Sequence, residues 1–459
     1  MLNITVEDKT ITISVGDHDF PPFKLGLSSI YHLDQMVVQR ETMPLLAEGI
    51  DFKVKGEIPA GERLIHLELL KQIIYLQTTY CLYPKVSTKD PNKDRSKPDD
   101  FEHYLNSIRN LSHFKNLCHS QILKGFLNGA PVIIAAPGPS LDVDFLRRMK
   151  GKACIMATGR SLPRIVRGGV TPDFVYVQDT SAQAWKDIFD FDESMGVLDT
   201  VLIANPVGHI HEYAHRVAHV YKAWNGYPFE KDVMGKIEEI APSSASGAFS
   251  MALTFGAGEV VFLGNDAGGL GEPDLHNGSL CHDLDAVLDN GELPQSLYRQ
   301  LAYFTWRTQS HDLWTKCDYI AGSQWLKSRV FQVKQGASVR FFDNSETGFI
   351  RDTGLVDPLP KDYAGQSFAM PKLPAYDPHF NPGKFVKIQM SRLDMIRRCI
   401  SRGDPIPSVG LAKPVNSVFE GIASYDGTSV TLAEDEVEPV LRKIEFLLDQ
   451  LDALSRMEW

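Results

Sequence analysis

Residues 132–136 form a short apolar run that contains no charged side chain. A run of this kind is typical of a strand that is buried on both of its faces. Pro137, Gly138 and Pro139 follow directly and break the strand. Ser140 and Asp142 are good helix-capping residues, and apolar positions continue into the next turns. The pattern therefore predicts a strand, a tight glycine turn and a helix in succession.

Strands and helices alternate through the middle of the chain. We expect further strands at 153–158, 174–178, 200–204, 259–263 and 339–343, with helices at 160–167 and 247–255. This alternation predicts an α/β fold with a central, doubly wound, largely parallel sheet of the Rossmann type. Ligands of such sheets bind beyond the carboxyl ends of the strands, so residues that directly follow a strand are the first site candidates.

The two flanks of this core differ from it in pattern. Alternating apolar residues around Asp8 and Lys9 predict a hairpin, and 62–79, 101–128 and 297–313 have the apolar spacing of helices. A helix with apolar residues at three- and four-residue spacing ends the chain. The predicted domains are an N-terminal α+β module with a polar linker (1–100), the Rossmann-like core (101–356) and a Pro-rich segment with a helical C-terminal module (357–459).

Composition adds constraints on function. With 47 basic and 58 acidic residues, the net charge of −11 argues against non-specific nucleic-acid binding. The six cysteines form no CxxC pair, which favours free thiols in a reducing compartment. Because no signal pattern and no run of 18 apolar residues is present, we expect a cytoplasmic protein without a membrane span.

Two strand ends carry residues that suit an anion. At the Gly138 turn, backbone N–H groups and the positive end of the following helix would attract a phosphate. Ser140 can serve there as a helix cap and as a phosphate ligand. Arg160 follows the next strand, where its guanidinium suits a phosphate or a carboxylate. An ordinary βα connection and a solvated surface arginine are the open alternatives.

Later strand ends offer acidic and small residues. Asp179 follows the strand at 174–178, where it could take a ribose hydroxyl or a divalent ion, or could cap the next segment. Ser243–Gly247 precede an apolar helix and could accept a carboxylate or a phosphate, or act only as a cap. Asp266 follows the strand at 259–263 and begins a glycine-containing loop.

Histidines occur in two places. His276 lies on the loop after Asp266, where an imidazole can act as a general base near neutral pH, although a lone histidine is more often structural. A second group lies between two predicted strands: His209, His211, His215 and His219. His211 and His215 have the spacing of a metal pair on a helix, but no cysteine or carboxylate frame accompanies them. We interpret this group as surface or core histidines and expect no metal site.

Taken together, these motifs resemble the motility-associated factor (Maf) flagellin glycosyltransferases and the wider MptE-like family. The resemblance covers about residues 106–354. It rests on Ala136-Pro-Gly-Pro-Ser-Leu141, Gly169-Val-Thr-Pro-Asp173 with Asp179, Ser243–Gly247, 256–266, His276 and Phe342-Asp-Asn-Ser-Glu-Thr-Gly348. The order is also similar to bacterial sialyltransferases with a GNGPSL motif, which use CMP-sialic acid.

The resemblance implies a CMP-activated nonulosonic acid as donor and assigns roles to individual residues. Gly138 and Ser140 would hold the donor phosphate, and Thr158 and Gly159 would line the nucleotide site. Ser244 or Ser246, with Gly247, would meet the sugar or the cytidine, and His276 would deprotonate the acceptor. The chain departs from the sialyltransferases at Ala136-Pro137, where they have Gly-Asn, and no tyrosine for the leaving group follows Asp266 closely.

The function predicted from the sequence is inverting transfer of a nonulosonic sugar to a Ser or Thr of flagellin or to a surface glycan. No cofactor is required, although Mg²⁺ is left open, and so is assembly into a homo-oligomer. One alternative is an MptE-like 6-hydroxymethylpterin diphosphokinase, in which Asp179 and Asp266 hold Mg²⁺ for transfer from ATP. The other is a non-catalytic nucleotide-binding scaffold.

Overall fold

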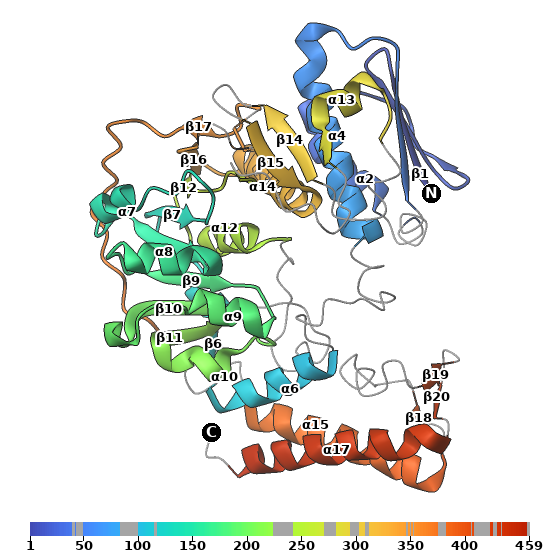
Figure 1. Cartoon of the computed structure of the whole chain (residues 1–459), viewed down its shortest axis with the longest axis vertical. Coiled ribbons are helices and arrows are strands. Elements are labelled where there is room, and N and C mark those ends of the chain that lie inside the picture. The colour runs from blue at the N-terminus through green and yellow to red at the C-terminus, as the bar shows by residue number, and fades with distance from the viewer. Residues whose placement is uncertain are drawn as a thin grey trace. The chain divides into compact units, whose positions relative to one another are not determined.

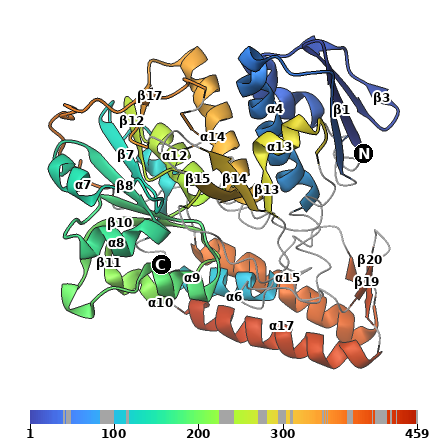
Figure 2. The same cartoon turned by 45° about the horizontal axis from the view of Figure 1, so that its top comes forward.

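The computed structural model describes residues 1–38, 42, 49–82, 100–113, 117–223, 242–269, 281–293, 303–307, 312–345, 348, 350–351, 353–374, 382–404, 406–407, 423–425, 429–432 and 434–456. The chain has two compact units, and each is described by itself. The first consists of Met1–Lys93, Leu127–Ser161 and Ala241–Ala369, and the second of Asp94–Phe126, Leu162–Ile240 and Met370–Trp459. Figures 1 and 2 give two views of their elements.

The first unit begins with a small mixed sheet in the order β3-β2-β1-β5, with β4 also paired to β2. Its strands are β1 (Leu2–Glu7), β2 (Thr10–Val15), β3 (His18–Asp19), β4 (Phe23–Lys24) and β5 (Ile50–Lys55). β1 and β2 are antiparallel, and the two residues between them, Asp8 and Lys9, have φ of 47° and 63°. Two positive φ values are what a tight hairpin turn requires, so the predicted hairpin is confirmed.

Helices pack beside this small sheet. They are α1 (Leu27–Tyr31), α2 (Leu33–Val37) and α4 (Arg63–Leu76), and α4 continues into a π-helical turn at Gln77–Leu82. α4 lies against α14 (Cys317–Gly336) in both views of the molecule. Between these two helices the carboxylate of Glu68, which is fully buried, lies 2.9 Å from Lys327 Nζ and 3.6 Å from Lys71 Nζ.

The first unit also contains five parallel strands in the order β17-β16-β12-β7-β8. They are β7 (Pro131–Ala135), β8 (Cys154–Thr158), β12 (Glu259–Leu263), β16 (Arg340–Asp343) and β17 (Asp357–Pro358). Every side chain of β7 is buried, as its uncharged run predicts. α7 (Val143–Met149) follows β7, and α12 (Ser244–Thr254) packs on β7 and β8.

The described part of the first unit also contains a three-stranded sheet and a further helix. The strands are β13 (Cys281–Asp283), β14 (Tyr303–Arg307) and β15 (Asp312–Lys316), and α13 (Leu284–Asp289) follows β13. β14 and β15 form an antiparallel pair in the region where the sequence predicted a helix at 297–313. That prediction is wrong for the described residues. The aromatic and β-branched residues of Tyr303-Phe-Thr-Trp306 suit a strand better than a helix.

The second unit contains four parallel strands in the order β9-β10-β11-β6. They are β6 (Leu117–His119), β9 (Phe174–Val177), β10 (Leu198–Ala204) and β11 (Val217–Lys222). The short helices of this unit are α8 (Leu162–Arg167), α9 (Ala182–Ile188) and α10 (Ile210–Tyr213).

The described part of the second unit also contains longer helices and a small antiparallel sheet. The helices are α6 (Asp100–Asn110), α15 (Pro382–Arg402) and α17 (Glu434–Ser455), and α15 and α17 lie side by side in both views. The sheet has the order β18-β20-β19, with β18 (Ile406–Pro407), β19 (Ala423–Tyr425) and β20 (Ser429–Leu432).

The predicted fold class is confirmed, with parallel strands alternating with helices, a small N-terminal α+β module and a helical C-terminal region. The single long helix predicted at 101–128 is wrong. α6 ends at Asn110 and β6 follows, because pairing of β6 with β11 overrides the local helical period. Within the described part of the chain, no helix is both long enough and apolar enough to cross a membrane.

Candidate functional site

A pocket of about 300 Å³ opens in the first unit beside the carboxyl ends of its parallel strands. β7 has β8 on one side and β12 on the other, so the chain reverses its direction of winding between β7 and β12. Such a reversal leaves a crevice at the strand ends, which is where ligands of open α/β sheets bind. The position of the pocket therefore follows from the strand order.

Four segments line this pocket: the turns after β7, β8 and β12, the start of α12, and one face of α14. The described lining residues are Ala136, Pro137, Gly138, Thr158, Arg160, Ser243, Ser244, Ala245, Gly264, Asn265, Ala267, Gly268, Tyr319, Gly322, Ser323 and Leu326. Gly138, Thr158, Arg160 and Ser244 of the predicted site are among them. No aspartate or glutamate is among these described residues, and Arg160 carries their one full charge.

The turn after β7 is held by the turn after β12. The backbone N–H of Gly138 donates to the carbonyl of Gly264 at 2.9 Å. The backbone N–H and the hydroxyl of Ser140 donate to Oδ2 of Asp266 at 3.0 and 2.9 Å. A Cβ at position 138 would lie 2.3 Å from that same Oδ2, so only glycine permits this approach.

This pairing changes what the Gly138 turn can bind. Asp266 is fully buried and places its carboxylate where the sequence analysis expects a phosphate near Ser140. The helix cap is Asp142, whose carboxylate accepts from the N–H of Phe145 at 2.9 Å. The phosphate role of Gly138 and Ser140 stays a prediction, and a phosphate beside Ser140 would face a negative charge of the chain itself.

Residues that follow β16 form a hydrogen bond to the turn after β7. Asn344 Nδ2 donates to the carbonyl of Ser140 at 3.0 Å, and the hydroxyl of Ser345 donates to Asp343 Oδ2 and accepts from the N–H of Gly348. Burial raises the pKa of Asp343 to about 7, the hydrogen bonds from Ser345 oppose this shift, and the nearby charge of Asp266 adds to it. Part of the sequence motif at 342–348 thus has a structural role, because its side chains stabilise these turns through hydrogen bonds.

The start of α12 gives the pocket a second and less obstructed helix end. Ser243 is the N-cap: its hydroxyl accepts from the N–H of Ser246 at 3.2 Å and lies 2.8 Å from the Ser246 hydroxyl. Ser246 is fully buried and also donates to the carbonyl of Gly322, so its side chain has a structural role. Gly247 is buried in the next position of the helix. Ser243, Ser244 and Ala245 line the pocket, and Ser244 is the one of these three that the sequence proposed as a ligand.

The turn after β8 presents one cation and one hydroxyl. Arg160 is exposed, whereas Thr158 is 2% exposed, and both line the pocket. Gly159 is buried between them. The hydroxyl of Ser161 donates to the carbonyls of Ala135 and Thr158 at 2.7 and 2.8 Å, which fixes this turn against β7.

Asn265 supplies the most specific polar group of the pocket. It is 7% exposed, and its Nδ2 donates to the carbonyls of Ile134 at 3.0 Å and Leu263 at 3.4 Å. These two carbonyls settle the orientation of the amide, which leaves Oδ1 buried without a hydrogen-bond donor. A buried acceptor of this kind favours a ligand that brings an N–H or O–H group.

Asp179 and His276 are not among the described lining residues of this pocket. Asp179 follows β9 in the second unit, where its Oδ1 accepts from the N–H and the hydroxyl of Ser181 at 3.0 and 3.1 Å. Ser181 in turn caps α9, so Asp179 stabilises a helix start, one of the two roles left open by the sequence. His276 lies outside the described residues, and its role as a general base stays a prediction.

The face of α14 was missed by the sequence analysis. Tyr319 and Ser323 line the pocket from this helix, and Tyr319 brings a phenol near the site, although it comes more than 50 residues after Asp266. The Cβ of a residue at Gly322 would lie 3.0 Å from the Ser243 hydroxyl, so this glycine lets α14 approach the start of α12 closely. Gly322 was the one local feature of the sequence that could have indicated this close approach of the two helices.

The four clustered histidines separate into two kinds. His215 and His219 are exposed, whereas His209 is 4% exposed. Burial is the main cause that lowers the pKa of His211 to about 4; the charge of Glu212 opposes the shift and Arg109 adds to it. The interpretation as surface or core histidines describes where these rings lie, and the expectation of no metal site stays a prediction.

Fold and pocket together define an α/β protein with parallel strands and a ligand pocket at a switch point of the sheet. Residues 105–271 match a family model described as 6-hydroxymethylpterin diphosphokinase MptE-like, which confirms the MptE-like resemblance over about a third of the chain. No curated protein matches the chain. A solved Maf glycosyltransferase from Magnetospirillum magneticum AMB-1 is similar at 12% identity and a TM-score of 0.42, covering 94% of this chain and 69% of that one.

Proposed function

We propose that this protein is a glycosyltransferase that moves a nonulosonic sugar from a CMP-activated donor to a hydroxyl of flagellin or of a surface glycan. The observation that carries the proposal is the charge of the pocket at the switch point. Its described lining has a helix start, one arginine and no carboxylate. Such a lining favours an anionic group, such as the phosphate of a CMP-activated donor.

The start of α12 and Arg160 are the groups suited to that phosphate. The first N–H groups of an α-helix lack partners within the helix and carry about half a positive charge between them. Ser244 and Ala245 stand at this position and line the pocket. The volume of about 300 Å³ is at the lower end for ligand pockets, so we expect it to hold the nucleotide part of the donor.

These groups would act on the leaving group of the reaction. The bond between the anomeric carbon and the phosphate oxygen breaks, and the electron pair leaves with CMP. Fixed dipoles and a guanidinium that stabilise the departing phosphate lower the barrier, by the same principle as an oxyanion hole. The acceptor hydroxyl forms the new bond from the opposite face, with inversion, and His276 takes its proton.

CMP binding to the full chain, measured by calorimetry, tests the site. We expect Arg160→Ala to weaken CMP binding about 10- to 100-fold, since a hydrogen bond to a charged group contributes ~1.5–3 kcal/mol. Arg164→Ala is the matched control, because Arg164 is also an exposed arginine but does not line the pocket. Equal CMP affinity of the wild type and Arg160→Ala would contradict the proposed phosphate site.

Turnover is tested separately with CMP-activated nonulosonates and a flagellin or glycan acceptor, with CMP release as the readout. We expect His276→Ala to abolish transfer while CMP binding persists. Full transfer by this variant would remove His276 from the mechanism. CMP binding without turnover of any such donor would favour the nucleotide-binding scaffold.

The description of the matching family supports a second candidate, a 6-hydroxymethylpterin diphosphokinase that uses ATP and Mg²⁺. Its weakness is Asp266, which we considered as an Mg²⁺ ligand: this carboxylate is fully buried and accepts two hydrogen bonds from Ser140. Incubation with ATP, Mg²⁺ and 6-hydroxymethylpterin separates the two candidates, because only the kinase would release AMP.

A further inference from the structure

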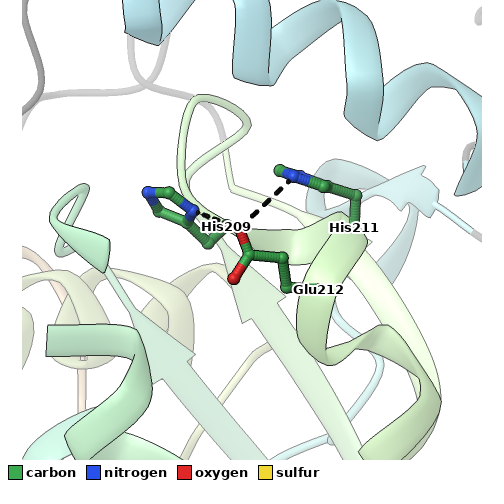
Figure 3. Close-up of side chains that lie close together, drawn as sticks. All are labelled: His209, His211 and Glu212. Carbon is green, nitrogen blue, oxygen red and sulfur yellow. Dashed lines mark hydrogen bonds and ion pairs between the residues drawn. The ribbon is translucent and has the colours of Figure 1, made fainter. Parts of the chain in front are cut away.

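Two histidines and a glutamate converge at the carboxyl end of β10, within the second unit. His209 is the N-cap of α10, and His211 and Glu212 belong to the first turn of this helix. Figure 3 shows both imidazole rings directed at the carboxylate of Glu212. None of the three belongs to the pocket of the first unit, so their arrangement needs an explanation of its own.

The three side chains are close enough together to surround one metal ion. Glu212 Oε1 lies 2.9 Å from His209 Nδ1 and 3.6 Å from His211 Nε2. One ligand atom from each residue fits within 4.8 Å of the others. Zinc bonds of about 2.0–2.2 Å in a tetrahedral site place neighbouring ligand atoms roughly 3.3–3.5 Å apart, between the two observed distances.

The ring of His211 is already oriented for coordination. Its Nδ1 lies 2.9 Å from the carbonyl oxygen of the Asn110 side chain, which can only accept, so Nδ1 carries the proton. The lone pair is then on Nε2, the atom nearest to Glu212. Metal-binding histidines usually donate their second N–H to an oxygen in this way.

His209 presents its Nδ1 to Glu212 and has two side chains of α6 on its far side. Its Nε2 lies 3.5 Å from Asn106 Nδ2, which can only donate, and 4.0 Å from Glu102 Oε1. The ring therefore carries its proton on Nδ1 and donates it to Glu212 at 2.9 Å. A metal ion bound at Nδ1 would take the place of that proton, and Nε2 would then carry a proton on the side of the Glu102 carboxylate.

The backbone that carries these ligands is held against α6 by hydrogen bonds to Asn110. Asn110 is fully buried: its Nδ2 donates to the carbonyls of Pro206 and Gly208 at 2.7 and 2.8 Å, and its Oδ1 accepts from the N–H of His211 at 2.8 Å. Trp185 packs so closely on Gly208 that a Cβ there would lie 2.7 Å from the ring. A fixed loop of this kind holds ligands in place before an ion arrives.

We propose that His209 Nδ1, His211 Nε2 and the Glu212 carboxylate bind one divalent transition-metal ion, with Zn²⁺ the best match to two imidazoles and a carboxylate. The Glu212 side chain is 48% exposed, which gives the ion a path from solvent and a fourth position for water. The expectation of no metal site among these histidines missed Glu212, whose carboxylate follows His211 directly. This inference is independent of the proposed transferase activity.

Zinc titration of the untagged full chain tests the proposal, with calorimetry and competition against a chromophoric chelator as readouts. We expect one Zn²⁺ per chain and a loss of affinity of about 100-fold or more in His211→Ala. His215→Ala and His219→Ala are matched controls, because both histidines are exposed neighbours outside the cluster. They should keep the wild-type stoichiometry and affinity.

Glu212→Gln guards against a folding artefact, since this half-exposed side chain can keep its shape and lose its charge. We expect it to bind Zn²⁺ much more weakly while its circular dichroism and unfolding midpoint stay at the wild-type values. Wild-type affinity in both His211→Ala and Glu212→Gln would overturn the proposal. So would a wild-type chain that binds no zinc, or an equal loss of binding in His215→Ala.

Discussion

Gly138→Ala places a methyl group where the turns after β7 and β12 already touch. The added Cβ would lie 2.3 Å from Asp266 Oδ2 and 2.5 Å from the carbonyl oxygen of Gly264. Both distances are well inside van der Waals contact. The Asp266 side chain could move aside, but the Gly264 oxygen belongs to the backbone at the end of a buried strand and cannot.

The expected cost follows from these two contacts. Crowding of a packed interior by one extra methyl group costs ~1–3 kcal/mol. Displacing Asp266 also weakens its hydrogen bonds from Ser140, and a bond to a charged group contributes ~1.5–3 kcal/mol. We therefore expect a loss of about 3–5 kcal/mol, a large part of the ~5–15 kcal/mol by which domains are stable.

Urea unfolding followed by circular dichroism measures this loss. Gly269→Ala is the matched control in the segment after β12, because a Cβ at position 269 meets nothing within 4 Å. It should change the free energy of unfolding by less than about 0.5 kcal/mol. If Gly138→Ala unfolded at the same urea concentration as this control, the close approach of the two turns would be refuted.

Two further predictions concern buried charges. Asp343, with a pKa raised to about 7, favours the folded state while protonated, so stability should fall by about 3 kcal/mol between pH 5 and pH 8 and Asp343→Asn should remove that part of the dependence in urea unfolding. An unchanged pH profile would contradict it. Lys327→Met should cost ~3–5 kcal/mol in thermal unfolding, because the fully buried Glu68 carboxylate loses its nearer ammonium partner and keeps the more distant Lys71 at 3.6 Å. An unfolding midpoint equal to that of the wild type would count against the pairing.

Elements whose signal is local could be predicted from the sequence. The uncharged run of β7 and the alternation of β1 and β2 each lie within a few residues, and the structure confirms them. The helix predicted over 101–128 was wrong because β6 is a strand through its pairing with β11, about 100 residues away. Periodicity within a short window cannot register a partner that far along the chain.

The candidate site also has features that local sequence predicts and features that depend on long-range contacts. Strand ends could be located, and four of the residues chosen from the sequence line one pocket: Gly138, Thr158, Arg160 and Ser244. Their binding roles stay predictions. The hydrogen bonds between Ser140 and Asp266 join residues that are 126 positions apart, and neither residue type indicates from the sequence that the other is its partner. Tyr319 was missed for the same reason, because only the packing of α14 on α12 brings it to the pocket.

That long-range bond determines where a phosphate can lie. A phosphate bound at Ser140 would have to displace the carboxylate of Asp266, which would lose two hydrogen bonds and stay buried beside a second negative charge. At the start of α12 no described acidic side chain occupies the first turn, and Arg160 lines the same pocket. We therefore expect the anion to bind at the start of α12. Gly138 has a structural role in this proposal: without a Cβ, it lets the turns after β7 and β12 approach each other, and Asn265 then faces the ligand.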